Sequence, residues 1–475
     1  MRLLGLFHKS MQNSYLFYDI ETSGLNQCFD QVLQFAAIRT DLELNELERY
    51  EILVKLNPDT IPSPQAILIH QLTFAQFENG ICEYEAMRKI HQLFNTPGTI
   101  TVGYNTLGFD DEFLRFSFYR NLLPPYTHQY ANNCSRMDLY PITVMYYLFK
   151  PEVISWPKIA DKPTLKLEHL SVHNKLANGK AHDAMTDVVA TLALARLLKK
   201  EQEMWEYLCG YFDKKIDTGR LTKLTTAFGE HLQALLVNGS FGAEKFYQCP
   251  AIELGTHYHY KNQSLWLQLD ALQLAKTTST SIAQTTFVYR KRFGEQPLLL
   301  PLTKRFSQHL SAERNQLMID NIDWLQKNQQ IFRDIIQHHK EYKYPEIPNI
   351  DVDAALYQNG FIKDNEQLIC NRFHLADLKE KAEMIEHFNN PNLRAQAIRI
   401  LGRNYPKALS ANYQKEFASY LHKIKSGEAV VDYRNESHLA PEEVLTEIAQ
   451  LQKAGNLNVV QIDLLEELTK YIQSL

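Results

Sequence analysis

The chain has 475 residues, of which 45% are hydrophobic and 22% are charged, and its formal net charge is −5. At ~150 residues per domain this length suggests about three domains. The composition is that of a soluble globular protein with enough apolar residues for more than one core. The acidic balance excludes a protein that is basic over its whole surface, so any nucleic-acid-binding surface must be local.

Neither a membrane span nor a secretory leader is expected. The apolar run in MRLLGLFHKS is too short for a signal peptide, and no uncharged apolar stretch approaches the ~18 residues that a membrane helix needs. The six cysteines form no Cys-x-x-Cys pair, which argues against a disulfide framework or a zinc site. We therefore expect a cytoplasmic protein with reduced cysteines and no membrane association.

Residues 14 to about 198 are predicted to form an α/β unit, because short apolar runs alternate with segments of helical periodicity. The last helix opens just after the turn signal Asn178-Gly179. The predicted elements are strands at 15–20, 31–41 and about 51–56, a Pro-rich loop at 57–67, a helix near 83–95, a strand at 99–105, an amphipathic helix at 110–121 and a helix at 181–200.

The predicted secondary structure of the rest of the chain changes twice. From about 199 to 350, short β-like runs with Gly and Pro predict a smaller β-rich domain that ends in a helix around 311–340. The stretch KYPEIPNIDVD marks the next boundary, and the residues after it are predicted to be mostly helical. Two sets of apolar residues there share a helix face, and we expect both to be core rather than partner-binding surface; they are Val444, Ile448 and Leu451, and Leu464, Leu468 and Ile472.

The stretch FYDIETSG places two carboxylates inside an apolar strand. Residues i and i+2 of a strand point to the same face, so Asp19 and Glu21 lie side by side and need a basic partner or a metal ion. An edge strand with a solvated outer face is the alternative. The spacing alone decides nothing, because it recurs at Asp41/Glu43, Asp110/Glu112 and Asp364/Glu366.

Two later segments carry further candidates. Asp110 follows a predicted strand at the start of a helix, where an ordinary helix cap is the alternative reading. His182 and Asp187 are five residues apart, a rotation of ~500° on a helix, so they cannot face one site from mid-helix. His182 must lie on the segment leading into the helix, with Asp187 one turn inside it. A loop-borne histidine beside a helix-borne carboxylate suits a general base next to a metal ligand, although an exposed histidine at a helix start is common.

Considered in order, these five residues resemble the DEDD superfamily of 3′→5′ exonucleases in its histidine variety, since Asp183 stands where the tyrosine variety carries tyrosine. The segments NSYLFYDIETSG, GYNTLGFDDEFLRFSFYRN, LKLEHLSVHN, AHDAMTDV and DAALYQNGF closely resemble the exodeoxyribonuclease I family. The resemblance covers essentially the whole chain. It implies an α/β fold with three domains: a ribonuclease H-like exonuclease domain with a mixed sheet (1–198), an SH3-like β-rich domain (199–350) and an α-helical C-terminal domain (351–475).

The resemblance also implies a function. The chain would degrade single-stranded DNA from its 3′ end to 5′-mononucleotides, in DNA repair and recombination. Asp19, Glu21 and Asp187 would bind metal, Asp110 would complete the shell of a second ion, and His182 would be the general base. An oxygen-rich site of this kind suits two Mg²⁺ ions, with Mn²⁺ as a possible substitute, rather than zinc.

Further residues correspond to DNA contacts of that family. Arg115, Tyr126 and Tyr130 would touch the single strand, and Lys166 would hold the substrate beside Glu21. Aromatic faces can stack on bases without sequence preference, while cations hold phosphates.

The chain departs from the family at two of these positions. Lys166 stands where the family often has arginine, which loses a bidentate contact, and Val144 replaces another family arginine. The basic run Arg290-Lys291-Arg292 is a weaker candidate for lining the DNA path. The family further implies a monomer that docks the acidic C-terminal tail of the single-stranded DNA-binding protein.

Four rival functions remain open at this point. Histidine-type sites of this kind also occur in enzymes that trim RNA and in polymerase proofreading subunits. An HD-type metal phosphohydrolase is suggested by His182-Asp183 but needs further histidines at helical spacing, and no such set is present in the sequence. A DNA-binding scaffold without activity is disfavoured because all five catalytic positions are filled.

Overall fold

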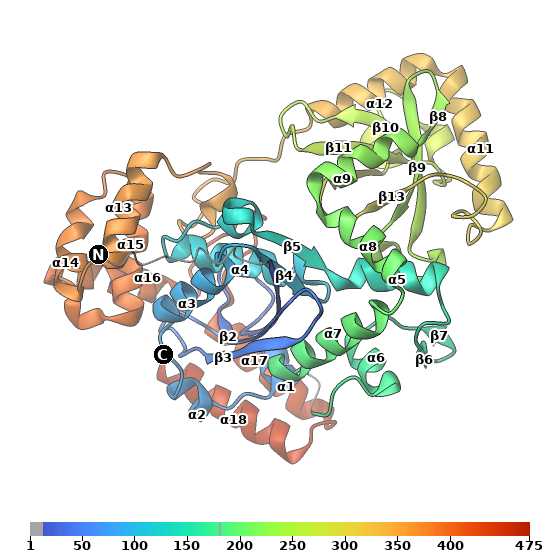
Figure 1. Ribbon diagram of the computed structural model, residues 1–475. Coiled ribbons are helices and arrows are strands. Elements are labelled where there is room, and N and C mark those ends of the chain that lie inside the picture. The colour runs from blue at the N-terminus through green and yellow to red at the C-terminus, as the bar shows by residue number, and fades with distance from the viewer. Residues whose placement is uncertain (1–12, 180–181) are drawn as a thin grey trace, which may run out of the picture.

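The computed structural model describes residues 13–179 and 182–475 (Figure 1). Its first sheet has the strand order β3-β2-β1-β4-β5. β1 pairs antiparallel with β2 and parallel with β4, so the sheet is mixed, as expected. The strands are β1 (Ser14–Thr22), β2 (Val32–Thr40), β3 (Glu46–Leu53), β4 (Thr99–Gly103) and β5 (Ser135–Asp138).

Helices pack on both faces of this sheet because β1 is apolar on both sides up to Asp19. Tyr15 and Phe17 point into a core shared with α5 and α7, whereas Leu16 and Tyr18 point into a core shared with α3 and α4. The helices of this region are α1 (Pro64–His70), α2 (Phe74–Glu78), α3 (Glu83–Phe94), α4 (Asp110–Arg120), α5 (Leu139–Phe149), α6 (Leu167–Asn174) and α7 (Ala184–Leu198).

Two expectations for this region are wrong. The segment 57–67, expected to be a loop, contains the start of α1, because Pro64 occupies the first turn of that helix, where its missing N–H is not needed. Helix α4, expected to be amphipathic, is buried on nearly all sides. Its arginines can be buried because Arg115 pairs with Asp111 and Arg120 with Glu83.

The second sheet is antiparallel, with the strand order β12-β11-β10-β9-β13 and β8 paired to β9. This arrangement agrees with the expected β-rich domain and is consistent with an SH3-like fold. The single helix expected at 311–340 is two helices, since Asn328 leaves helical geometry between them. The elements are α8 (Gln202–Cys209), α9 (Lys214–Gly219), β8 (Thr225–Phe228), β9 (His231–Val237), β10 (Gln248–Thr256), β11 (Gln263–Gln268), α10 (Ile282–Thr285), β12 (Val288–Arg292), β13 (Leu298–Leu300), α11 (Ala312–Lys327) and α12 (Gln329–Glu341).

The C-terminal region is helical, as expected, and packs against the first domain (Figure 1). Val444, Ile448, Leu464, Leu468 and Ile472 are buried in one core with residues of α1, so the predicted apolar faces are core. The helices are α13 (Asp364–Leu375), α14 (Leu378–Met384), α15 (Pro391–Asn404), α16 (Ala411–Lys425), α17 (Pro441–Ala454) and α18 (Val459–Ser474). The domain limits 1–198, 199–350 and 351–475 stay predictions.

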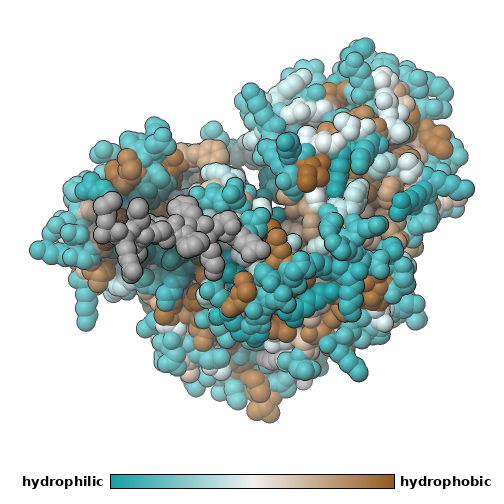
Figure 2. Space-filling model, in the orientation of Figure 1, coloured by the Kyte–Doolittle hydropathy of each residue, from teal (hydrophilic) through white to brown (hydrophobic). Residues whose placement is uncertain are grey.

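Among the described residues, none of the helices has the length and apolar character needed to cross a bilayer. Figure 2 shows a mostly hydrophilic face whose hydrophobic residues form small separate patches. The same view shows a notch between the lobe of the second sheet and the C-terminal helices.

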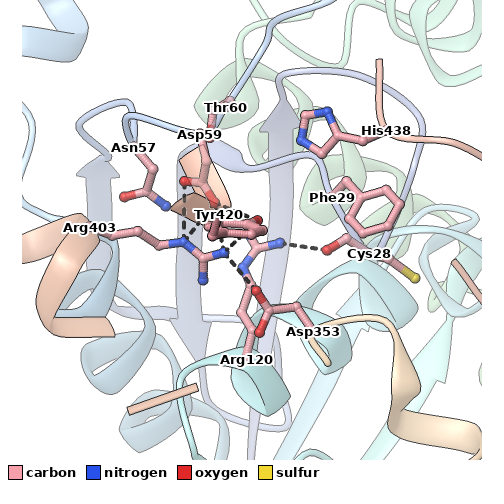
Figure 3. A pocket seen from close by; sticks show the side chains of 10 residues that line it. All are labelled: Cys28, Phe29, Asn57, Asp59, Thr60, Arg120, Asp353, Arg403, Tyr420 and His438. Atoms are coloured by element: carbon pink, nitrogen blue, oxygen red, sulfur yellow. Dashed lines mark hydrogen bonds and ion pairs between the residues drawn. The ribbon is translucent and has the colours of Figure 1, made fainter. Parts of the chain in front are cut away.

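A buried cluster of ion pairs joins the C-terminal helices to the first domain (Figure 3). Arg403 on α15 donates to Asp59 at 2.7 Å and to Asp353 at 2.6 Å. Arg399, one turn earlier, donates to Asp353 at 2.9 Å, and Tyr420 donates to Asp59 at 3.0 Å. Burial alone would raise the pKa of Asp353, but Arg403 and Arg399 outweigh burial and lower it to about 2. The cluster therefore keeps buried carboxylates charged between the two regions.

Replacing Arg403 with methionine should lower the free energy of unfolding by about 3–5 kcal/mol, because it leaves Asp59 and Asp353 buried without their shared cation. Denaturant unfolding at neutral pH measures the loss. The matched control is Arg394→Met, which removes an exposed ion pair with Glu386 and should cost only about 0–1 kcal/mol. Similar small losses in both variants would contradict a stabilising role for the buried cluster.

Candidate active site

The site begins at the end of β1, where Asp19 and Glu21 are half-buried on one face and Ile20 is buried on the other. This arrangement confirms the alternation expected from the sequence. Glu21 lies opposite Gln34 of β2, and the strand register shifts directly after it. The chain then bends at Gly24, where a Cβ would lie 2.4 Å from the Asp30 carboxylate, so a larger residue would require that side chain to move.

Asp110 is buried at the first position of α4, next to β1. Burial, together with the charges of Asp138 and Asp111, raises its pKa to about 8, although hydrogen bonds from its own N–H and from the Ile20 N–H lower it. In the described part of the chain Asp110 forms no ion pair. Asp110 is therefore more than a helix cap: it is a buried carboxyl without a cation.

The neighbouring Asp111 has the opposite environment. It accepts hydrogen bonds from Arg136 at 2.6 Å and Arg115 at 2.7 Å, and His128 lies 3.0 Å away. These groups hold the pKa of the Asp111 carboxyl well below its usual range despite its burial. The two adjacent carboxylates therefore differ: Asp111 pairs with Arg115 and Arg136, whereas Asp110 lies close enough to Asp19 to raise its pKa.

His182 lies outside α7 and Asp187 lies in its first turn, as the sequence predicted. Asp183 caps the helix by accepting from the Thr186 N–H at 3.1 Å, so it does not act as the ligand that an HD-type site would need. His182 adopts a left-handed backbone conformation, with φ of 62°. Its N–H donates to Asp187 at 3.3 Å.

A glutamine on β2 holds the start of α7 against the sheet. The Gln34 side chain donates to Asp183 at 3.3 Å and accepts from the Ala184 N–H at 3.3 Å. This contact places the first turn of α7 beside β1. As a result, ligand atoms of Glu21, His182 and Asp187 lie within 4.8 Å of one another.

The electrostatics of the site fit a divalent cation. Burial raises the pKa of Asp19 well above its usual value, and the charges of Asp110, Glu21, Asp187 and Asp183 raise it further. Burial also raises the pKa of Asp187 to about 6, although His182 lowers it. Carboxylates that repel each other in this way favour protonation unless a cation joins them. An oxygen-rich donor set with one imidazole suits Mg²⁺ or Mn²⁺.

The residues expected to contact DNA differ in accessibility. Tyr130 is 71% exposed, and the Lys166 side chain is 73% exposed beside Glu168, at 3.6 Å. Arg115 is buried and lies over the Tyr126 ring at 5.2 Å. Val144 is fully buried in the core, so its side chain cannot reach a phosphate. The roles of Tyr130, Lys166, Arg115 and Tyr126 in DNA binding stay predictions.

The basic run at 290–292 is only partly available. Lys291 is fully buried and paired with Asp217, so the expectation that it lines the DNA path is wrong. Arg290 lies over the rings of Tyr342 and Tyr344, at 5.4 and 5.3 Å. Alternation along β12 explains the difference, since neighbouring residues of a strand point to opposite faces.

Two aromatic residues near Arg115 were not predicted. Tyr357 accepts from Arg115 at 2.9 Å and donates to Glu112 at 2.6 Å. Phe361 is 86% exposed, and its ring lies 5.8 Å from that of Tyr126. Both occur in DAALYQNGF, which the sequence marked only as a resembling segment. Their positions beside α4 depend on how the C-terminal region packs against the first domain, so no local sequence pattern predicts them.

Comparison with known proteins agrees with this geometry. Residues 16–195 match an exonuclease family model, and residues 350–475 match the exonuclease I C-terminal domain. Exodeoxyribonuclease I of Escherichia coli is 29% identical over 452 residues, which covers 90% of this chain and 92% of that protein. The protein of the same name from Buchnera aphidicola (strain Sg) is 29% identical over 98% of this chain and 96% of its own.

A solved structure extends the match to three dimensions. E. coli exonuclease I in complex with a 5cy-dT13 oligonucleotide superposes with a TM-score of 0.84 at 26% sequence identity, over 97% of this chain and 99% of that one. The match therefore includes both sheets and the C-terminal helices. With this full-length agreement in sequence and structure, the chain belongs to the exodeoxyribonuclease I family.

Proposed function

We propose that this protein hydrolyses single-stranded DNA from the 3′ end and releases 5′-mononucleotides. The observation that carries the proposal is the convergence of Glu21, His182 and Asp187 within 4.8 Å, near the half-buried carboxyl of Asp19 and the buried carboxyl of Asp110. The E. coli relative has been solved with dT13 and with dA16, which supports single-stranded DNA as the substrate class. A role in DNA repair and recombination belongs to the same proposal.

The carboxylates would hold divalent metal. Asp19, Glu21 and Asp187 would bind it, and Asp110 would complete the shell of a second ion. A zinc-bound form of the E. coli relative supports divalent-metal binding in the family, but the oxygen-rich donors here favour two Mg²⁺ ions, with Mn²⁺ as a substitute. Bound ions of this kind supply charge stabilisation to the attacking and leaving oxygens.

The remaining residues would bind substrate and move the proton. His182 would accept the proton of the attacking water, since an imidazole is partly neutral at physiological pH. Lys166 would hold a phosphate, while Tyr126 and Tyr130 would stack on bases and Arg115 would line the strand. We also propose a cytoplasmic monomer that docks the acidic tail of the single-stranded DNA-binding protein; the docking surface is not assigned to residues.

Replacing Asp19 with asparagine should reduce cleavage of 3′-labelled single-stranded DNA at least ~100-fold, because it removes a charged metal ligand. The variant should stay folded, since Asp19 is a half-buried carboxyl surrounded by other carboxyls. Activity assays with Mg²⁺ on matched DNA and RNA strands measure both the loss and the substrate class.

The control for this assay is Asp41→Asn. Asp41 belongs to another Asp-x-Glu pair and caps a turn by accepting from Asn45 at 2.9 Å, away from the catalytic carboxylates. Wild-type activity in Asp19→Asn would end the metal-binding assignment. A wild-type preference for RNA would instead favour an RNA-trimming enzyme with the same site.

Mg²⁺ should raise the melting temperature more at about pH 8 than at about pH 6, by linkage. The folded pKa of Asp110 is raised to about 8 and that of Asp187 to about 6. A carboxyl whose pKa is raised by folding makes its full contribution to stability below its unfolded-state pKa. This contribution is lost as the pH rises through its folded-state pKa. A cation bound to the ionised carboxylates offsets this loss, so its effect grows with pH.

Thermal unfolding with and without Mg²⁺ at the two pH values measures this difference. NaCl at matched ionic strength is the control, because general screening acts on all surface charges. Equal shifts at both pH values, or equal shifts with NaCl, would count against a metal site made of these carboxyls.

A further inference from the structure

Glu168 lies beside the proposed general base and belongs to none of the groups assigned above. One of its carboxylate oxygens lies 3.2 Å from His182 Nε2. The other lies 3.3 Å from His169 Nε2 and 3.6 Å from Lys166 Nζ. One carboxylate therefore contacts both the histidine proposed as the base and the lysine proposed as a phosphate contact.

The scaffold fixes Glu168 more firmly than it fixes His182. Glu168 is in the first turn of α6, where a helix favours negative charge, and Leu170 of the same helix is buried in the main core with Ala184 of α7. His182 lies outside α7 with a left-handed backbone, and its side chain is 46% exposed. The Glu168 carboxylate is thus held by the packed helix α6, whereas the His182 imidazole lies on the segment that precedes α7.

The chemistry of the contact sets the tautomer of the imidazole. An ionised carboxylate can only accept hydrogen bonds, so we assign the proton of the neutral ring to Nε2. The lone pair of Nδ1 is then free to accept a proton. A carboxylate that orients a functional histidine in this manner is a recurrent arrangement in enzymes.

We propose that Glu168 is a positioning residue that holds the His182 imidazole in the orientation and tautomer needed for proton transfer beside Glu21 and Asp187. The inference rests on the proposed function, in which His182 is the base. Glu168 acts through His182 and is not assigned to the metal: the described group of metal-competent side chains contains Glu21, His182 and Asp187 without it.

Kinetics of Glu168→Gln and Glu168→Ala on oligo-dT test the proposal. We expect kcat to fall by about 10–100-fold, as for other residues that orient a functional histidine, while KM stays within about twofold. His169→Ala is the matched control, because His169 contacts the same carboxylate from the other side; its kcat should stay near wild type. A change in KM alone would overturn the proposal, since it would mean that Glu168 acts through Lys166 and DNA binding.

A double-mutant cycle separates positioning from general structural damage. In a His182→Ala background, Glu168→Ala should cause no further loss of kcat, because the group through which it acts is gone. An equal loss in both backgrounds would overturn the proposal. Circular dichroism and thermal unfolding check that every variant is folded.

A spectroscopic measurement keeps the inference separate from the proposed activity. In metal-free wild-type protein, ¹⁵N NMR of the His182 ring should report the Nε2–H tautomer, and Glu168→Ala should convert this signal to a mixture of tautomers. An unchanged His182 signal in Glu168→Ala would overturn the positioning role. If the tautomer changes as expected but the wild-type protein does not degrade DNA, the proposed function fails while the Glu168–His182 contact stands.

Discussion

Repulsion between carboxylates on one face of β1 is the constraint around which this molecule is arranged. Asp19 is half-buried near Asp110, Glu21 and Asp187, and each of these charges raises its pKa. Such a group of anions lowers the stability of the folded chain near neutral pH. Several other buried carboxylates are paired with arginine, and Asp111, which contacts Arg115 and Arg136, is one example. Among the described residues, Asp19 and Asp110 form no such ion pair with arginine.

Keeping these carboxylates together requires rigid support on every side. β1 lies between two apolar cores, so it cannot relax by shifting away from α4 or α7. The C-terminal region adds the buried contacts of Arg403 to Asp59 and Asp353. The second sheet is tied in by Arg136, which bridges Asp111 and Glu295. Buried ion pairs from the C-terminal region and the second sheet therefore both fix the first domain, on which the metal-competent residues lie.

The sequence predicted the parts of this arrangement that depend on local pattern. Alternation in FYDIETSG predicted the correct face for Asp19 and Glu21, and the five-residue spacing of His182 and Asp187 predicted the position of His182 outside α7. Contacts between distant segments were not predictable in this way. Glu168 meets His182 only because α6 and α7 share a core, and Arg120 can be buried only because Glu83 lies across from it. Periodicity predicts which face of an element is apolar, but it does not predict which charged side chains from distant segments form pairs.

The existing partners of Arg115 limit how it could contact a DNA strand. One of its terminal nitrogens donates to Asp111 and the other to Tyr357, while its Nε is buried without a partner among the described residues. A phosphate at Arg115 would have to replace one of these acceptors or approach the edge of the guanidinium. The guanidinium also lies over Tyr126, whose ring meets the exposed Phe361. Arg115 is thus part of an aromatic cluster and contacts both Tyr126 and Tyr357, so its proposed role in strand binding would include holding these rings in place.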